Sequence, residues 1–161
     1  MHGNASAENT KNNASRCLYA FAAPESVKVY GGAKQPLLRP ARHDPEIHGP
    51  DGLGGVEGLP SAQSDSVRER IESGPAIEAM ASAVKQTWNN GAGAKVTLVA
   101  SGPLTNIALF VSVYTDLFDA IERIVFMGGG IGVGNRSAVA GSSIPFDFFY
   151  AGPLSHLLSL F

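Results

Sequence analysis

The hydrophobic pattern in the second half of the chain predicts a strand, a helix and a second strand. Val96 to Val99 is a short run of apolar and β-branched residues, which is typical of a buried strand. The turn Ser101–Pro103 follows, and apolar residues then recur at helical spacing at Leu104, Ile107, Ala108 and Val111. The run from Ile124 to Met127 predicts the second strand. A strand–helix–strand unit of about 35 residues indicates a parallel sheet with right-handed crossovers.

A parallel sheet also predicts where a ligand would bind. Ligands of such α/β sheets lie at the carboxyl ends of the strands. In this chain Ser101 follows the first predicted strand. Met127 is the last residue of the second strand, and the segment up to Asn135 follows it. These residues are therefore the first candidates for a functional site.

The remaining apolar positions predict three further helices and one short strand. The first helix spans about Ala5 to Ala22, and its apolar stripe consists of Ala14, Cys17, Leu18 and Phe21. The second helix stops at Asn89–Gly91, and its apolar face consists of Ile77, Met80, Val84 and Trp88. A third, short helix contains Leu117, Ala120 and Ile121, and the short strand contains Val27, Val29 and Tyr30.

From Pro36 to Pro75 the chain is rich in glycine and proline and shows no strong period. A loop of this length in a compact domain is usually functional or disordered. Its glycines, with Gly49 to Gly58 the densest stretch, predict a flexible segment, and His48 stands at the start of that stretch.

Composition narrows the class of protein. The 161 residues suffice for one domain with a sizeable core, and 44% hydrophobic with 16% charged content is typical of a soluble globular protein. A net charge of −2 gives no reason to expect nucleic acid or an anionic membrane as partner. Cys17 is the only cysteine, so a disulfide framework is excluded and a reducing compartment is favoured. We expect the Cys17 side chain to act as a small buried hydrophobic residue. The polar segment Met1–Asn13 does not fit a signal peptide, which favours a cytoplasmic location.

Several motifs together resemble one family. VTLVASGPLTNIAL at Val96–Leu109, followed by IVFMGGGIGVGNRSAVA at Ile124–Ala140, resembles the inosine–uridine-preferring nucleoside hydrolases. HGNASAENT at His2–Thr10 and PLLRPARHDPEIHGPDGLGG at Pro36–Gly55 resemble the same family in the same order. The resemblance implies an α/β fold, with an incomplete parallel, Rossmann-like sheet and flanking helices. It also implies hydrolysis of the N-glycosidic bond of purine or pyrimidine ribonucleosides to ribose and free base.

The resemblance extends over residues 1–140 and then stops. We expect residues 1–140 to form a partial nucleoside hydrolase domain, with the first strand and the C-terminal part of the family missing. Residues 141–161 form a divergent hydrophobic tail, in which Gly141 and Ser143 stand where the family has Glu and Asn. Prolines, an aspartate and a histidine interrupt this tail, so it is not a membrane span. A surface helix remains an alternative, and so does a short edge strand near Ile144–Tyr150.

The family's metal chemistry is expected to be absent from this chain. Members hold a calcium ion with an N-terminal DxDxxxDD-type cluster, and one of these aspartates activates a water. That cluster is not present, and neither is the later Asp with its neighbouring acid His; Asp44, Asp51 and Asp65 lie scattered in the loop. No catalytic residue is therefore retained, and calcium is not expected to bind. Ser101 matches a position whose backbone carbonyl contacts the calcium.

Four positions match substrate-binding residues of the family. Asn4 matches an asparagine of the ribose pocket, and the alternative is a helix N-cap. His48 matches a loop histidine near the nucleoside, and the alternative is a solvated side chain. Met127 and Asn135 match residues that face the sugar, although a methionine at a strand end is usually core.

Two other hypotheses stand beside the hydrolase. One is a non-catalytic fragment or pseudoenzyme. The weaker one is a nucleotide-binding oxidoreductase, suggested by the glycine run from Gly128 to Gly134, although no frame through it gives GxGxxG. Base preference is not determined by the sequence, and homo-oligomerisation is left open.

Overall fold

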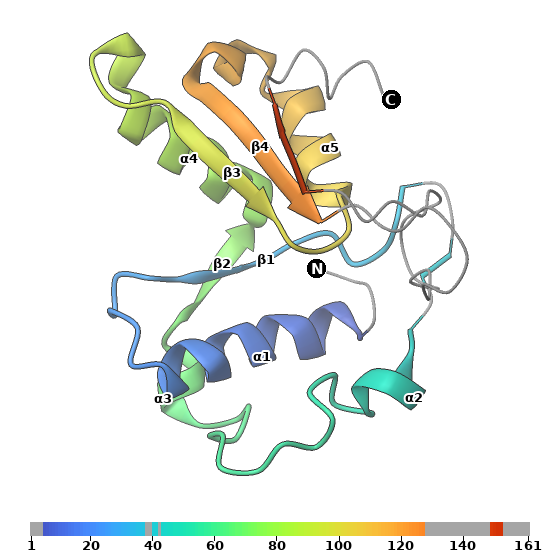
Figure 1. Ribbon diagram of the computed structural model, residues 1–161. Coiled ribbons are helices and arrows are strands. Elements are labelled where there is room, and N and C mark those ends of the chain that lie inside the picture. Colours follow the sequence, from blue (N-terminus) through green and yellow to red (C-terminus); the bar gives the residue numbers. More distant parts are fainter. Residues whose placement is uncertain (1–4, 38–39, 42, 128–148, 153–161) are drawn as a thin grey trace. The chain divides into compact units, whose positions relative to one another are not determined.

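A computed structural model describes residues 5–37, 40–41, 43–127 and 149–152 (Figure 1). The chain divides into two compact units, one ending at Ala76 and the other beginning at Ile77. The elements of the first unit are α1 (Ala7–Ala20), β1 (Val29–Gly31), α2 (Pro45–His48), α3 (Asp65–Arg68) and β2 (Ile71–Pro75). Those that follow are α4 (Ala76–Trp88), η1 (Asn89–Gly91), β3 (Val96–Ala100), α5 (Thr105–Val113), η2 (Thr115–Ala120), β4 (Ile121–Met127) and β5 (Phe149–Gly152).

The predicted strand–helix–strand unit is confirmed. Strands β3 and β4 pair in parallel, with Leu98 opposite Ile124 and Ala100 opposite Phe126, and α5 connects them. One extra residue is accommodated near the start of the pair, where Val96 faces Ile121. Beyond that irregularity the register is continuous to the ends of both strands, so the two strands end side by side.

One face of this sheet carries the core of the second unit. Buried side chains of α4, α5, η2 and the two strands form a single cluster: Ala81, Val84, Ala100, Ile107, Phe110, Val111, Leu117, Ala120, Ile121 and Ile124. The predicted apolar face of α4 is confirmed, because its other three members pack against this cluster. Both helices therefore cover the same face of the sheet. On the other face Val99 is 74% exposed and Met127 is 56% exposed.

The sheet of the second unit is mixed and not purely parallel. Strand β5 pairs antiparallel with β4, and Met127 lies opposite Phe149 while Ile124 lies opposite Gly152. Part of the C-terminal segment thus adds a third strand beside β4. This strand overlaps the end of the Ile144–Tyr150 stretch for which an edge strand was left open, and the rest of that stretch lies outside the described residues.

The first unit has a small parallel sheet and one long helix. Val29 of β1 faces Ile71 of β2, and Tyr30 faces Glu72. Helix α1 begins after Ser6, whose side-chain oxygen accepts a hydrogen bond from the Asn9 amide at 3.1 Å, as a helix N-cap does. The predicted helix is confirmed with two residues fewer at each end, and the predicted short strand is confirmed but begins at Val29 and ends at Gly31.

The predicted apolar stripe of α1 is wrong. Ala14 is exposed and Phe21 is 84% exposed, whereas Asn13 and Ser15 are buried at 8% and 0%. Cys17 is only half-buried, so it is not the buried hydrophobe that was expected. Polar side chains are buried here because they donate to backbone carbonyls of the long loop; Ser15 Oγ, for example, donates to the Val67 oxygen at 2.7 Å.

The predicted structureless segment from Pro36 to Pro75 contains α2, α3 and β2. Strand β2 was missed because its sequence, IESGP, has a single large apolar residue, Ile71. Its pairing with β1 is formed by backbone groups, which leave no hydrophobic pattern in the sequence. The segment is therefore an ordered part of the first unit.

Truncating Phe110 to alanine should destabilise the second unit strongly. This ring is 0% exposed at the centre of the core and lies 5.7 Å from the Tyr114 ring, so its removal leaves a cavity and should lower the free energy of unfolding by about 3–5 kcal/mol. Urea unfolding followed by fluorescence of Trp88, the single tryptophan, measures the loss. Val113→Ala on the same helix, at a side chain 58% exposed, is the control. Equal losses in the two variants would contradict the assignment of the core.

Candidate functional site

Two of the predicted site residues lie together at the carboxyl edge of the sheet. Ala100 and Phe126 are paired, so Ser101 and Met127 are the next residues on neighbouring strands. Both are exposed. Helix α5 begins four residues after Ser101, so the turn Ser101–Leu104 lies between this edge and the start of the helix. Ser101 and Met127 therefore lie at the edge that the strand order predicted, while residues 128–135 lie outside the described residues.

Among the residues that the structure describes, this edge offers contact with a ligand and no group suited to proton transfer. Strands β3 and β4 carry two titratable residues, Glu122 and Arg123, and both lie at the opposite, amino end of β4. Arg123 donates to the Glu122 carboxylate at 2.8 Å, and this hydrogen bond lowers the pKa of Glu122. A backbone carbonyl at Ser101 and the thioether of Met127 can contact a ligand, but neither is a general acid or base.

The other predicted site residues are distributed differently. His48 belongs to the first unit, where it ends α2 and is half-buried. Its backbone oxygen accepts a hydrogen bond from the Gly54 amide at 2.7 Å. Asn4 and Asn135 lie outside the described residues, as does the glycine run from Gly128.

The described residues do not fit the calcium site that the resemblance implies. Among them no three histidine, cysteine, aspartate or glutamate side chains come close enough to hold a metal ion. Calcium needs six to eight converging oxygens. Asp51 illustrates the difference, because one of its carboxylate oxygens accepts from the Leu53 and Gly55 amides at 3.0 and 3.1 Å. That carboxylate stabilises a turn of its own loop.

The segment that follows His48 forms a tight turn, which we call the glycine turn (Gly49–Gly55). Gly49, Gly52, Gly54 and Gly55 all have φ between +68° and +83°, a region that glycine adopts without strain. Asp51 organises this turn through the two amides that its carboxylate accepts. These hydrogen bonds, first the one from Leu53 and then the one from Gly55, hold the pKa of Asp51 below its ordinary value.

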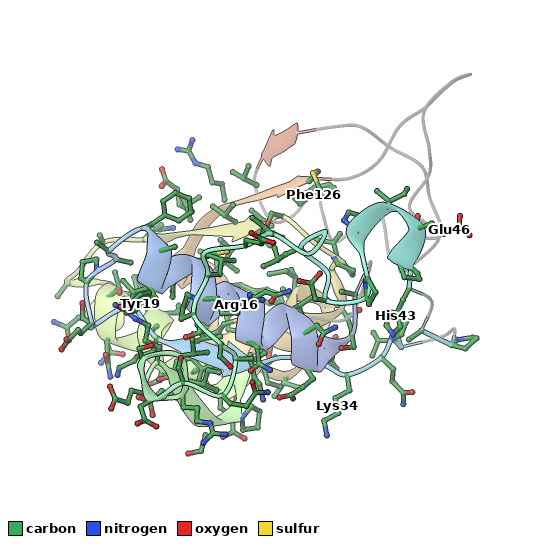
Figure 2. The ribbon with its side chains drawn as sticks, turned by 90° about the horizontal axis from the view of Figure 1, so that it is seen from below. Arg16, Tyr19, Lys34, His43, Glu46 and Phe126 are labelled. Atoms are coloured by element: carbon green, nitrogen blue, oxygen red, sulfur yellow. The ribbon has the colours of Figure 1, made fainter. Side chains whose placement is uncertain are left out.

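Helix α1 holds the loop through three polar side chains on one face. Asn9 Nδ2 donates to the Pro50 oxygen at 2.9 Å, and Asn13 Nδ2 donates to the Asp51 oxygen at 2.7 Å. Arg16 Nε donates to the Pro60 oxygen at 2.9 Å. Figure 2 labels Arg16 on α1 and shows the segment between α2 and α3 running alongside this helix.

Sequence reasoning missed this polar face of α1. Its signal was present, because Asn9, Asn13 and Arg16 recur at i, i+4 and i+7, the spacing of one helical face. The same spacing in apolar residues was read as the buried stripe. The spacing alone marks a polar face, but its partners are backbone carbonyls, which the sequence does not identify.

Comparison with known proteins places the chain in a family. A family model described as inosine-uridine preferring nucleoside hydrolase matches residues 1–147. The chain belongs to this family of nucleoside hydrolases. Among curated relatives, the pyrimidine-specific ribonucleoside hydrolase RihA of Shewanella sp. (strain ANA-3) is 39% identical over 146 residues, which is 90% of this chain and 42% of the relative. An uncharacterised protein of Schizosaccharomyces pombe is 36% identical over 140 residues, which is 87% of this chain and 39% of the relative.

Solved structures show the same fold. The purine-preferring ribonucleoside hydrolase from Gardnerella vaginalis matches with a TM-score of 0.64 and 28% identity, over 79% of this chain and 38% of the other. The plant nucleoside hydrolase PpNRh1 matches with a TM-score of 0.61 and 26% identity, over 88% of this chain and 42% of the other. The incomplete α/β nucleoside hydrolase fold that was expected is therefore confirmed. The chain spans about two fifths of the length of the curated relatives it matches.

In the part of the chain that the structure describes, no helix has the length and apolar character needed to cross a bilayer.

Replacing Gly52 by alanine should loosen the glycine turn more than replacing Gly58. Both residues have left-handed φ, +83° and +84°, so an alanine should cost each about 1–2 kcal/mol. A Cβ on Gly52 would in addition lie 2.5 Å from the Ala5 Cβ, whereas nothing lies within 4 Å at Gly58. We expect faster proteolysis of the loop in Gly52→Ala than in Gly58→Ala, measured by the rate of limited cleavage. Equal rates would show that Ala5 does not pack on the turn.

The glycine turn should loosen at low pH because of Asp51. Its pKa is lowered in the folded protein, so its ionised form stabilises the turn above the ordinary pKa of about 3.9. That stabilisation is lost as the pH falls below this value and through the lower folded pKa. Carboxylate ¹³C shifts should give the lowered pKa, and the Leu53 and Gly55 amide shifts should change over the same pH range. Asp51→Asn should abolish that transition; if the amide transition persists in it, another group controls the turn.

Proposed function

We propose that this chain provides part of a ribonucleoside hydrolase, which cleaves the N-glycosidic bond to give ribose and free base. The observation that carries the proposal is the family match over residues 1–147, together with the exposed pair Ser101 and Met127 at the carboxyl edge of the sheet. Ligands of parallel sheets bind at this edge. The relatives named above are described as acting on purine or pyrimidine ribonucleosides, and we extend that substrate class to this chain without choosing between the bases.

The proposed roles are those that the resemblance to the family implies for these positions. We assign Met127 to apolar contact with the ribose, and Asn4 and Asn135 to hydrogen bonds with its hydroxyl groups. His48 is assigned to the nucleoside from the side of the loop. For Ser101 we propose that its backbone carbonyl is the group that contacts calcium in the family. The other ligands of such an ion are not found among the described residues.

The sequence also favours a chain that contacts parts of the substrate without catalysing its hydrolysis. Cleavage of the ribose–base bond passes through an oxocarbenium-like state and needs an activated water and an assisted leaving base. Across all 161 residues no two aspartates lie closer in sequence than Asp116 and Asp119, so no DxDxxxDD-type cluster is present. We therefore propose that the chain alone is non-catalytic. Its single cysteine supports a reducing compartment, and we propose the cytoplasm.

The purified 161-residue chain should release no ribose from inosine or uridine above the uncatalysed rate. An unactivated water leaves most of the barrier in place, so the result should be the same with and without added calcium. A reducing-sugar assay measures the release, and a complete pyrimidine-specific hydrolase is assayed in parallel as the positive control. Release well above background, in protein free of host hydrolase, would overturn the proposal that the chain is non-catalytic.

A chimera tests the assignment to a hydrolase. It adds a family-like strand with the aspartate cluster before residue 1 and a family-like continuation, with its Asp and His, after residue 140. Hydrolysis in this chimera, and its loss when Met127 is replaced by alanine, would support the proposed role of the edge. Absence of hydrolysis in a folded chimera would contradict it. Hydrolysis with the cluster alone, while the native tail stays in place, would show that residues 141–161 are a working part of the site.

A further inference from the structure

The backbone of His48 is fixed by the glycine turn that follows it. Its carbonyl oxygen accepts from the Gly54 amide at 2.7 Å, so the turn closes back onto His48 itself. Asp51 supports this closure from inside, because its carboxylate accepts from the Leu53 and Gly55 amides on either side of Gly54. Any force that displaces the turn therefore displaces the backbone of His48.

The glycine turn is itself attached to α1 by the buried side-chain amide of Asn13. Asn13 is 8% exposed, and both ends of its side chain are used. Its Nδ2 donates to the Asp51 oxygen at 2.7 Å, while its Oδ1 accepts from Arg16 Nη1 at 3.0 Å. Arg16 thus sets which way the amide faces. The amide donor is therefore aimed at the oxygen of the half-buried Asp51, which would lose this partner if the amide were changed.

Close packing supports the same contact. The α-carbon of Gly52 lies so near the start of α1 that an added Cβ would meet the Ala5 Cβ at 2.5 Å and Asn13 Nδ2 at 3.3 Å. Asn9 adds a second donor one helical turn earlier, to the Pro50 oxygen. Further along, Arg16 and Ser15 hold the Pro60 and Val67 oxygens. The loop after His48 is thus attached to α1 at four carbonyls.

We propose that Asn13 and Asp51 are positioning residues for His48: Asn13 anchors the glycine turn to α1, and Asp51 keeps the turn closed on the His48 carbonyl. The proposal rests on the proposed function in one respect, the role of His48 at the nucleoside. It means that the segment from His48 to Gly55 moves as one body with α1. On this proposal the segment is held in place, in contrast to the flexible segment that its glycines predicted.

The test is an isosteric change at Asn13, with a matched change next to it. Asn13→Asp replaces the donor to Asp51 by an acceptor and keeps the oxygen that Arg16 contacts. Asn12→Asp makes the same change on the same helix, where the amide donates to the exposed Glu8 carboxylate at 3.3 Å. Amide hydrogen exchange in the full chain is measured by NMR. We expect exchange at Leu53, Gly54 and Gly55 to rise about tenfold in Asn13→Asp and to stay within twofold of wild type in Asn12→Asp.

A second readout separates positioning from general loosening. The His48 ring signals, assigned with a His48→Gln variant, should shift in Asn13→Asp and in Asp51→Ala, and should return towards wild type in Asp51→Asn, which keeps an oxygen acceptor. Amides of α4 should be unchanged in all of these variants. Equal effects of Asn13→Asp and Asn12→Asp, or His48 signals that do not move in Asp51→Ala, would overturn the proposal.

These measurements use no nucleoside, so they are independent of the proposed function. Uridine and inosine are then titrated into the wild-type chain while the same His48 signals are observed. A shift of these signals supports the substrate role of His48. No shift, with the exchange results as expected, would count against that role alone and leave the anchoring by Asn13 in place.

Discussion

A backbone carbonyl that leaves water needs a hydrogen-bond donor, and this requirement shapes both units of the protein. In the second unit the strand ladder meets it, and apolar side chains can then fill the core around Phe110. In the first unit the long loop has few neighbours in a sheet. Its carbonyls are met instead by side chains of α1, which is why Asn13 and Ser15 are buried and Phe21 is not.

The second unit was largely predictable from the sequence. Val84, Ile107 and Ile124 were expected at core positions, and each is buried. The position of Ser101 and Met127 at the carboxyl edge also followed, because it is determined by the strand order and the helix connection. Hydrophobic periodicity succeeds here since the driving force is burial of apolar area.

The first unit was not predictable in the same way. The buried face of α1 was predicted wrongly because its polar residues bind backbone carbonyls 38 to 52 residues away. Every residue has such a carbonyl, so the sequence does not reveal which ones are bound. Strand β2 was missed for the same reason, since its pairing with β1 is made by the backbone. Among the candidate residues, His48 could be singled out by resemblance. The residues that hold it, Asn13 and Asp51, could not, because their roles depend on the closed shape of the glycine turn.

The Ser101–Met127 edge and the His48 segment, which belong to different units, are held by different interactions. The Ser101–Met127 edge is held by a packed apolar core beneath it, and its position should tolerate changes of surface charge. The His48 segment is held by directional hydrogen bonds, each of which fails if one atom is changed. A change of a polar side chain that is harmless at the surface of the second unit would therefore alter the geometry of the first unit if it fell on one of these hydrogen bonds.

The polar buried face of α1 also has a consequence during protein synthesis. This helix leaves the ribosome well before Pro60 and Val67, whose carbonyls Arg16 and Ser15 will bind. A helix with a wide apolar face would expose an aggregation-prone hydrophobic surface until those residues are synthesised. Asn13, Ser15 and Arg16 are instead hydrated until their partners arrive, so α1 waits for the loop without risk of aggregation through this face.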